Sequence, residues 1–481
     1  MPESRYQGCE FIMTLNIKDL QNRWYGLETE KINNEDPKKN KRKYLHFDFR
    51  LLNLNKENLD FVWKPDIVAR HSFYPFINSS IIIRRKKKND NGIRVLSKKE
   101  RPIRYASHKD ALLFSWYNYY LGQLYEEKIK KLGIDNSVIA YRSLEKSSID
   151  FAKEVFDFIK KQKNCIVLCF DIHGFFDHLD HKIIKKQWKR VLCLDDKLEL
   201  PDDHYAIYKA ITKYSSIDLE IIKKIFNNSR GRFCSPEELR EKISKTGLIK
   251  KNTNQFGIPQ GSPISAVISN FYMLDFDVIL NNYINQCHGL YKRYCDDIIV
   301  VLPFSDNDGP KEVSNKSELF IKEEILRQKL EIQDEKTDKK IFKHNTEQLT
   351  CSTFDLKKST IQYLGIRFDG INLDLRDSTW SRYHRRLSKL VALKTYKFLN
   401  GNNQSFPKKK IYEKFTDFGN NNLVNYAKNA ERILGSELIK KKITKYRLIK
   451  NIKKKIKTET LKQKSKQHHA SKSLPKTPPN T

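Results

Sequence analysis

The sequence predicts an α+β fold, on three observations about where apolar residues lie. A β-rich run begins at residue 81, and two short continuous apolar runs, "CIVLCF" and "IIVVL", are typical of strands covered on both faces. Apolar and aromatic positions recur at helical spacing over residues 109–132 and again from Trp380 to about residue 434. We therefore expect strands and helices to share the core of this 481-residue chain.

The charge balance indicates a polyanionic partner. The chain has 92 Lys and Arg against 58 Asp and Glu, a formal net charge of +34. A field of this sign attracts nucleic acid. The alternative is a protein that is basic only through its tail. Basic residues also cluster at residues 83–104, well inside the chain, which argues against that alternative.

The N-terminus lacks a signal-peptide pattern, and no apolar stretch approaches the roughly 20 residues that span a bilayer. The eight cysteines are scattered and form no Cys-x-x-Cys pair, which is typical of reduced thiols. The sequence therefore predicts a cytoplasmic protein with no membrane partner.

The first half of the chain is expected to start with a mainly helical extension, residues 1–80. "SSIIIRRKKKNDNGIRVLSKKERPIR" then offers two strands around the turn residues "NDNG", which predicts a basic hairpin that contacts phosphates. A helix over 109–132 follows, and the strand "CIVLCF" ends at Asp171. Beyond it we expect a helix starting near Leu179, and mostly helices over residues 200–250.

The second half contains a Gly/Pro-punctuated turn that leads into a long apolar helix, in "FGIPQGSPISAVISNFYMLDFDVIL". A helix is expected over 318–330, and "STIQYLGIRFDGINLDL" alternates like a hairpin. Helices rich in Lys and Arg follow from Trp380. The last residues form a basic helix that fades into a Ser/Pro/Lys tail, which we expect to be disordered.

Three aspartates lie at the ends of the predicted strands: Asp171, Asp296 and Asp297. Crowded carboxylates beside an apolar interior are unfavourable unless a cation joins them. Carboxylates on adjacent strands form the oxygen-ligand platform that Mg²⁺ prefers, and nucleotide transfer to a hydroxyl uses two such ions about 4 Å apart. Most Asp-Asp pairs are simply solvated turn residues. The apolar flanks of this pair favour the metal site.

Five motifs resemble those of reverse transcriptases in order and approximate spacing: "FDIHGFFDHLDH", "GIPQGSPISAVISNFY", "YCDD", "EKT" and "YLGIRF". The resemblance covers residues 80–435 and implies a right-hand polymerase architecture, with fingers, a palm with an antiparallel sheet, and a helical thumb. The expected division is an N-terminal extension (1–80), fingers and palm (81–370), thumb (371–435), and a basic C-terminal helix with a disordered tail (436–481).

The resemblance implies a catalytic role for five residues. Asp171 and Asp296 resemble the carboxylates that bridge two Mg²⁺ ions, with Mn²⁺ as an alternative, and Asp297 would act more through position and charge. The carbonyl of Ile172 would complete a metal shell. Lys336 resembles the lysine that protonates pyrophosphate as it leaves.

The resemblance also implies contacts to dNTPs and to the primer. Arg101 resembles the fingers arginine that grips the triphosphate, and the alternative is one solvated cation among many. Phe176 resembles the aromatic that blocks a ribose 2′-hydroxyl, so DNA is the expected product; either Phe175 or Phe176 must instead be a core residue. Gln260 would contact the incoming nucleotide, and its flanking glycines let backbone approach closely. The turn that supports the primer end is expected at Tyr363, Leu364 and Gly365.

Cys295 departs from the family pattern, because Ala or Val is common between the Tyr and the Asp pair. A small apolar thiol should fit there, so we expect altered packing and not lost activity.

No endonuclease or RNase H pattern follows the thumb motifs, so the chain resembles compact, mostly bacterial reverse transcriptases. Residues 175–188, 200–217 and 363–387 are most similar to the antiviral, defence-associated groups, with type 3 as a candidate. That class implies a structured non-coding RNA as template, and a second polymerase subunit or a homo-oligomer as a further partner. Two alternatives stay open: a retron-like or group II intron-derived enzyme, and a non-catalytic RNA-binding scaffold.

Overall fold

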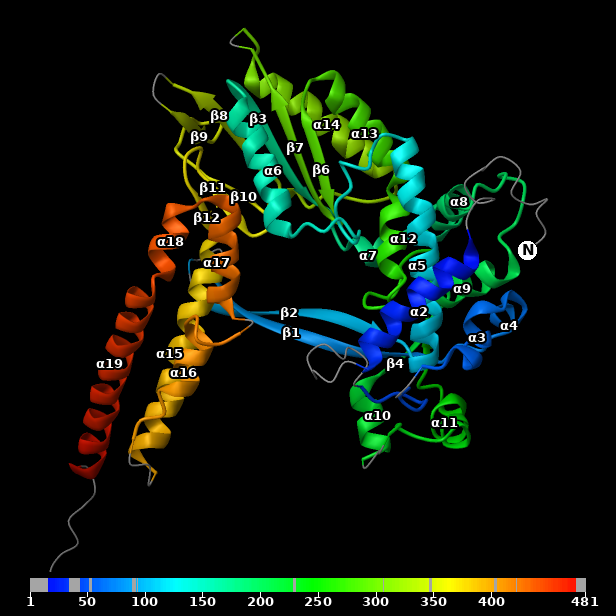
Figure 1. Ribbon diagram of the computed structural model, residues 1–481, viewed down its shortest axis with the longest axis horizontal. Coiled ribbons are helices and arrows are strands. Elements are labelled where there is room, and N and C mark those ends of the chain that lie inside the picture. Colours follow the sequence, from blue (N-terminus) through cyan, green and yellow to red (C-terminus); the bar gives the residue numbers. More distant parts are fainter. Residues whose placement is uncertain are drawn as a thin grey trace, which may run out of the picture.

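The computed structural model of the protein describes residues 16–472, except 34–43, 52–53, 89–91, 93, 228–230, 306, 346–347, 402–404 and 421. Helices and strands are mixed along this part of the chain, and its strands form three sheets. This mixture confirms the predicted α+β class. Figure 1 shows the sheet that contains β3, β6 and β7 beside the long ribbon of β1 and β2, with the C-terminal helices at one end.

The central sheet is antiparallel, with strand order β6-β7-β3-β8-β9. The two predicted apolar runs become its neighbouring strands β3 and β7, and alternate side chains of each strand enter two different cores. Ile166 and Val300 pack in one core, whereas Val167 and Ile299 pack in the other. Burial on both faces therefore explains the continuous apolar pattern. The strands are β3 (Asn164–Asp171), β6 (Leu290–Tyr294), β7 (Asp297–Pro303), β8 (Asp338–His344) and β9 (Leu349–Ser352).

The basic hairpin consists of β1 (Phe76–Lys88) and β2 (Arg94–Tyr105), paired antiparallel. Its expected turn at residues 89–92 lies almost wholly outside the described residues. β4 (Ser215–Asp218) pairs parallel to β1, and β5 (Lys250–Lys251) pairs with β4. Residues 200–250 are mostly helical, as expected, but the short strands β4 and β5 interrupt the helices, because β4 is stabilised by a partner strand far away in sequence. The helices there are α9 (Asp202–Thr212), α10 (Leu219–Ile225) and α11 (Pro236–Lys242).

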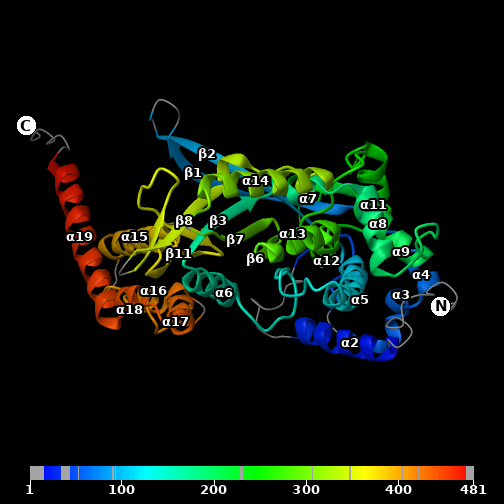
Figure 2. The same ribbon diagram turned by 90° about the horizontal axis from the view of Figure 1, so that it is seen from above.

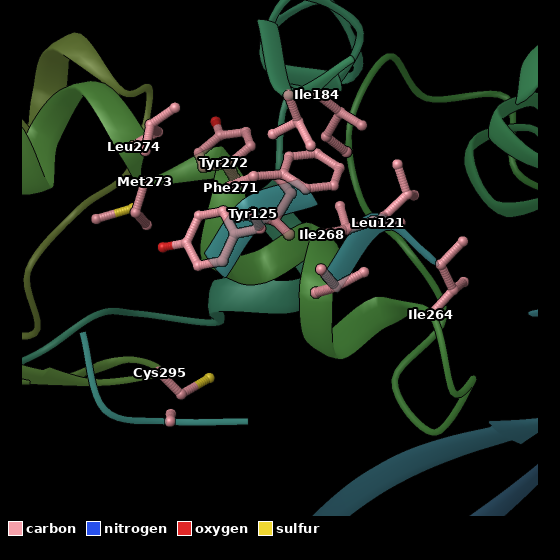
Figure 3. Packing of buried hydrophobic residues seen from close by; sticks show 14 of the residues in the cluster. Leu121, Tyr125, Ile184, Ile264, Ile268, Phe271, Tyr272, Met273, Leu274 and Cys295 are labelled. Carbon is pink, nitrogen blue, oxygen red and sulfur yellow. The ribbon is translucent and has the colours of Figure 1, made fainter. Parts of the chain in front are cut away.

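Helices α5 (His108–Lys131), α8 (His181–Val191) and α12 (Ser265–Tyr272) pack together beside the central sheet. Figure 3 shows Tyr125 of α5, Ile184 of α8 and Phe271 of α12 in one buried cluster. The predicted long apolar helix is two helices, α12 and α13 (Leu274–Gln286), and the helix expected at 318–330 is α14 (Pro310–Arg327). The other helices on this side are α2 (Ile17–Asn33), α3 (Asp60–Trp63), α4 (Pro65–Ala69) and α7 (Phe175–His178). Helix α6 (Ser148–Lys161) instead packs in the second core, against the opposite face of the central sheet.

The C-terminal part starts with a three-stranded sheet where a two-stranded hairpin was expected: β10 (Ile361–Tyr363), β11 (Ile366–Phe368) and β12 (Leu373–Leu375). Five helices follow: α15 (Asp377–Leu399), α16 (Lys409–Phe415), α17 (Leu423–Leu434), α18 (Glu437–Ile443) and α19 (Lys445–Lys472). α19 packs along α15 and is the outermost element at this end of the molecule in both views (Figures 1 and 2). The expected disordered tail beyond residue 472 lies outside the described residues.

None of the described helices combines the length and the apolar character that a membrane span requires. Cys193 is disulfide-bonded, so the expectation that every cysteine is a reduced thiol is wrong for that residue. Among the described residues, the free thiols are Cys165, Cys169, Cys234, Cys287, Cys295 and Cys351.

Candidate active site

The three predicted aspartates meet at one edge of the central sheet. Asp171 ends β3 and lies directly opposite Asp297, the first residue of β7. Asp296 belongs to the two-residue turn that joins β6 to β7, and its carbonyl accepts a hydrogen bond from the Ile172 N–H at 3.2 Å. The sequence predicted this meeting because each aspartate adjoins an apolar strand whose position in the sheet is fixed by burial.

The electrostatics of this edge favour an added positive charge. Removal from water, together with the Asp171 carboxylate, raises the pKa of Asp296. Removal from water and repulsion by Asp296 and Asp171 raise the pKa of Asp297 to about 6. Asp297 keeps an exposed surface, but it lies in a concave site where protein atoms replace much of its water shell. Proton uptake near neutrality is thus the response of crowded carboxylates that are partly removed from water.

Lys336 supplies the nearest cation. It ends a short 3₁₀ turn, Asp334–Lys336, and its Nζ lies 2.5 Å from Oδ1 of Asp171. The backbone beside it is fixed by the Gln333 N–H, which donates to the Asp171 carbonyl at 2.8 Å. The structure therefore brings the "EKT" lysine to the aspartates, although 165 residues separate Lys336 from Asp171.

The donor set fits Mg²⁺ by its chemistry. The Ile172 carbonyl, next to Asp171, accepts none of the backbone hydrogen bonds found among the described residues, so an oxygen is available beside the carboxylates. Within the same part of the chain, no three His, Cys, Asp or Glu side chains already converge on a common point. Mg²⁺ needs only one or two protein carboxylates, because water and substrate phosphates fill its other positions.

A buried ion pair supports the turn that carries Asp296. The Arg293 guanidinium is fully buried and binds Asp277 through Nε at 2.7 Å and Nη2 at 2.6 Å. Its Nη1 donates to the carbonyl of Cys295 at 3.0 Å, and the Tyr291 hydroxyl donates to Asp277 at 2.6 Å. No sequence pattern indicated this pair, because Asp277 lies in an apolar helix and Arg293 in a short strand.

Cys295 fits the turn as a buried neutral thiol. It is 3% exposed, belongs to the same buried cluster as Phe271 and Tyr125, and lies at the lower edge of that cluster in Figure 3. Burial raises the pKa of the thiol to about 12, so it does not ionise at neutral pH. Its φ of +60° is a conformation that non-glycine residues rarely adopt. The unusual feature at this position is therefore backbone conformation as well as packing.

The segment from Gly257 to Gly261 joins the site to the hairpin. The Ile258 N–H donates to the Phe176 carbonyl at 2.9 Å, and the Gln260 carbonyl accepts from the Arg104 N–H of β2 at 2.9 Å. Gly261 has a φ of +113°, and a Cβ there would lie 2.8 Å from Cγ2 of Ile103. Glycine is thus required for the close approach of this segment to β2.

Phe175 and Phe176 have different surroundings. Phe175 is 3% exposed in the core, whereas Phe176 is half-buried and only packs against that core. Arg101 is exposed on β2 opposite Ile81, three residues before Arg104. The structure therefore joins Phe176 to the Gly257–Gly261 segment through one backbone hydrogen bond, and it shows no contact among the described residues between Arg101 and the aspartates.

A hollow of about 620 Å³ opens beside Asp171, Asp297 and Lys336. The predicted turn lines it: Leu364 and Gly365 have φ values of 45° and 90°, so they form a two-residue hairpin loop between β10 and β11. Sequence reasoning missed four further lining residues from the C-terminal helices or just before them: Arg376, Thr379, Arg382 and Tyr426. The helical segment that supplies Arg382 was predicted to be basic, but no motif singled out these positions.

The central sheet with its edge aspartates, the basic hairpin and the C-terminal helices together have the layout of a right-hand polymerase, as the sequence predicted. Residues 119–368, just over half of the chain, match the family described as reverse transcriptase (RNA-dependent DNA polymerase). The chain belongs to that family. No curated protein matches the sequence significantly.

Solved telomerases share a distant likeness with this chain. Apo telomerase from Candida tropicalis is 14% identical, with a TM-score of 0.41, over 81% of this chain and 62% of that chain. Telomerase from Candida albicans, in complex with the TWJ fragment of telomeric RNA, is 11% identical, with a TM-score of 0.41, over 82% of this chain and 56% of that chain. The chain thus spans only a little over half of the length of these telomerases.

Proposed function

We propose that this protein is an RNA-directed DNA polymerase that adds dNTPs to a DNA 3′ end. The observation that carries the proposal is the pairing of Asp171 with Asp297 next to Asp296, at the mouth of a hollow that also contains Lys336. Membership of the reverse transcriptase family and the net charge of +34 support a nucleic-acid substrate.

Asp171, Asp296 and the Ile172 carbonyl would hold Mg²⁺ or Mn²⁺, with Asp297 tuning the charge of the site. Two bound ions supply activation of the primer hydroxyl and neutralisation of the departing pyrophosphate. The raised pKa values of Asp296 and Asp297 support this assignment, because carboxylates that are removed from water and crowded together are stabilised by an added cation.

The chain's own side chains would orient the substrates. Lys336 would hold a proton for the leaving pyrophosphate, and its ammonium already lies 2.5 Å from Asp171. Phe176 would contact the dNTP sugar beside Gln260, and Arg101 would reach the triphosphate from the hairpin. The primer end would lie against Tyr363, Leu364 and Gly365, which all line the hollow.

We further propose that the template is a structured non-coding RNA and that the cytoplasmic enzyme acts in bacterial antiphage defence, with a second polymerase subunit or a second copy of itself. The support is the resemblance of residues 175–188, 200–217 and 363–387 to defence-associated enzymes. A retron-like or intron-derived enzyme would share the chemistry. A retron RNA or a flanking intron RNA in the neighbouring genome would favour that alternative.

Incorporation of labelled dNTPs on a primed RNA, with and without Mg²⁺, tests the chemistry. We expect Mg²⁺-dependent incorporation by the natural protein and its loss in Asp296→Ala. Asp157→Asn, which changes a partly exposed carboxylate on α6 that does not line the hollow, is the matched control and should remain active. Equal incorporation by Asp296→Ala would refute the site and favour the non-catalytic scaffold.

A further inference from the structure

Helix α19 has two chemically different sides. Its buried residues Leu448 and Ile452 enter the C-terminal core. Polar residues continue that contact, because Lys455 donates to Ser388 at 2.8 Å and Gln463 donates to the Ala392 carbonyl at 3.1 Å. One side of α19 thus packs against α15, and the opposite side lies at the outer edge of the molecule (Figures 1 and 2).

The outer side carries a row of exposed lysines, Lys450, Lys453, Lys457 and Lys464, which we call the α19 lysine row. Their spacing of three, four and seven residues keeps them on one helix face over about 21 Å. None of the four forms an ion pair with a carboxylate in the part of the chain that the structure describes. Like charges three or four residues apart on one face destabilise a helix, so the row is unfavourable unless an anion covers it.

The surroundings of the row are also positive. Glu459 is the one acidic residue between Lys445 and Lys466, and it binds Gln463 on the side that faces α15. Between α15 and α19 lies a hollow of about 390 Å³, lined in part by His384, Lys454 and Lys455. Burial and the nearby cations Lys455, Arg447 and Lys442 lower the pKa of His384, which shows the sign of the local field.

We propose that the α19 lysine row binds the phosphate backbone of a folded RNA segment. This RNA would lie outside the hollow beside Asp171, Asp297 and Lys336, which we call the catalytic hollow. The inference rests on the proposed function, because RNA is the polyanion that such an enzyme must hold. α19 contributes none of the residues that line the catalytic hollow. RNA bound at the row would therefore be held away from the reacting strand, as an anchor for the part of the template that is not being copied.

A membrane surface fits the row less well. Interfacial helices present a wide apolar face to lipid, whereas the exposed large apolar residues of α19 are Tyr446 and Leu461 alone among those described. Tyr446 is 74% exposed beside Lys450, with 5.6 Å between the Lys450 Nζ and the ring centre, so an aromatic ring also lies next to the cations. Aromatic rings beside cations are typical of nucleic-acid contacts.

The test compares the full chain with a variant in which Lys450, Lys453, Lys457 and Lys464 are all changed to Gln. The probe is a blunt RNA hairpin of about 20 base pairs, longer than the row, whose affinity is measured between about 50 and 200 mM salt. We expect about tenfold weaker binding. The slope of log K against log salt concentration, the salt slope, should be smaller in magnitude by about three to four, since each phosphate contact contributes about 0.9. Extension of a short primer on a short template should not change.

The matched control changes four other exposed lysines to Gln: Lys64, Lys130, Lys223 and Lys245. Each is ion-paired with a neighbour on its own helix or on an adjoining turn, so the net charge falls equally while the row stays intact. We expect the salt slope of the control to equal that of the natural protein.

Four outcomes would overturn the inference. The first two are an unchanged salt slope in the row variant and an equal fall of the RNA affinity in the row variant and the control. The other two are a loss of short-primer extension that parallels the loss of RNA affinity, and row-dependent binding of phosphatidylserine vesicles in place of RNA. A protein that incorporates no dNTP on any template but still shows row-dependent hairpin binding would refute the proposed function and leave this inference standing.

Discussion

Asp171 and Asp297 face each other across the boundary between β3 and β7, the two most continuously apolar strands of the central sheet. Strand pairing therefore holds the two carboxylates together, and removal from water followed by mutual repulsion raises the pKa of Asp297. The same apolar residues that fix the register also remove water from the site. The fold thus prepares a negative site before any cation or substrate arrives.

The first prediction concerns pH. The folded-state pKa of Asp297 is about 6, above its ordinary value near 4, so the folded protein binds the proton more tightly than the unfolded chain does. Without Mg²⁺, this contribution to stability is present below about pH 4 and lost as the pH rises through about 6. The free energy of unfolding, measured with urea, should therefore fall more steeply between these pH values for the natural protein than for Asp297→Asn.

Mg²⁺ should raise the unfolding midpoint of the natural protein more at pH 7.5 than at pH 5, because protons compete with the ion for the carboxylates. Asp157→Asn is the control for a general loss of one charge. Identical pH profiles for the natural protein and Asp297→Asn would show that the carboxylates do not interact.

The second prediction separates the two neighbouring phenylalanines. Phe176→Ala should reduce discrimination against rNTPs with a small effect on stability, because Phe176 is only half-buried. Phe175→Ala should instead destabilise the fold by roughly 3–5 kcal/mol, since Phe175 is a core residue. Competition between rNTPs and dNTPs, measured beside thermal unfolding, checks both. Unchanged rejection of rNTPs by a folded Phe176→Ala would disprove the proposed gate.

The third prediction tests the contact between the Gly257–Gly261 segment and β2. Gly261→Ala should weaken dNTP binding, seen as a raised KM, because the new Cβ would meet Ile103 at 2.8 Å and the Arg104 carbonyl at 3.0 Å. The left-handed φ adds roughly 1–2 kcal/mol of strain. Gly26→Ala is the control, since open space surrounds that helical position, and it should be neutral or stabilising. Equal kinetics for the two variants would contradict the close approach.

The fourth prediction concerns the buried pair beneath the turn. Arg293→Met should cost roughly 3–5 kcal/mol, because it leaves the buried Asp277 without its cation. Arg293→Met combined with Asp277→Leu should recover much of that stability, since both charges are then removed. We expect polymerase activity to stay low in the double variant, because the Cys295 carbonyl still lacks its donor. Urea unfolding and dNTP incorporation measure the two effects separately, and full activity in the double variant would refute the supporting role.

The local sequence pattern was enough to predict that the three aspartates lie close together, because each one follows or precedes an apolar strand whose burial fixes its place in the sheet. Phe176 and Gln260 lie in two punctuated motifs that the structure joins through the hydrogen bond from the Ile258 N–H to the Phe176 carbonyl. Their contacts to a nucleotide stay predictions. The turn at Leu364 and Gly365 was likewise predicted from a motif and has the expected tight geometry.

Tertiary partners decided the features that the sequence could not predict. β4 is a strand because it pairs with β1, and no local pattern distinguishes it from the surrounding helices. Arg376 and Tyr426 reach the catalytic hollow only because the C-terminal helices fold back on the central sheet. Tyr363 is 4% exposed in the second core, so its ring supports the turn from beneath.

The identity of the template tests the central claim most directly. The full chain is given a DNA primer on an RNA of defined, non-repetitive sequence, with all four dNTPs, and the product is sequenced. The account predicts DNA complementary to the RNA, absent when Asp171 is changed to Asn. A product unrelated to the RNA sequence, or equal synthesis by Asp171→Asn, would contradict it.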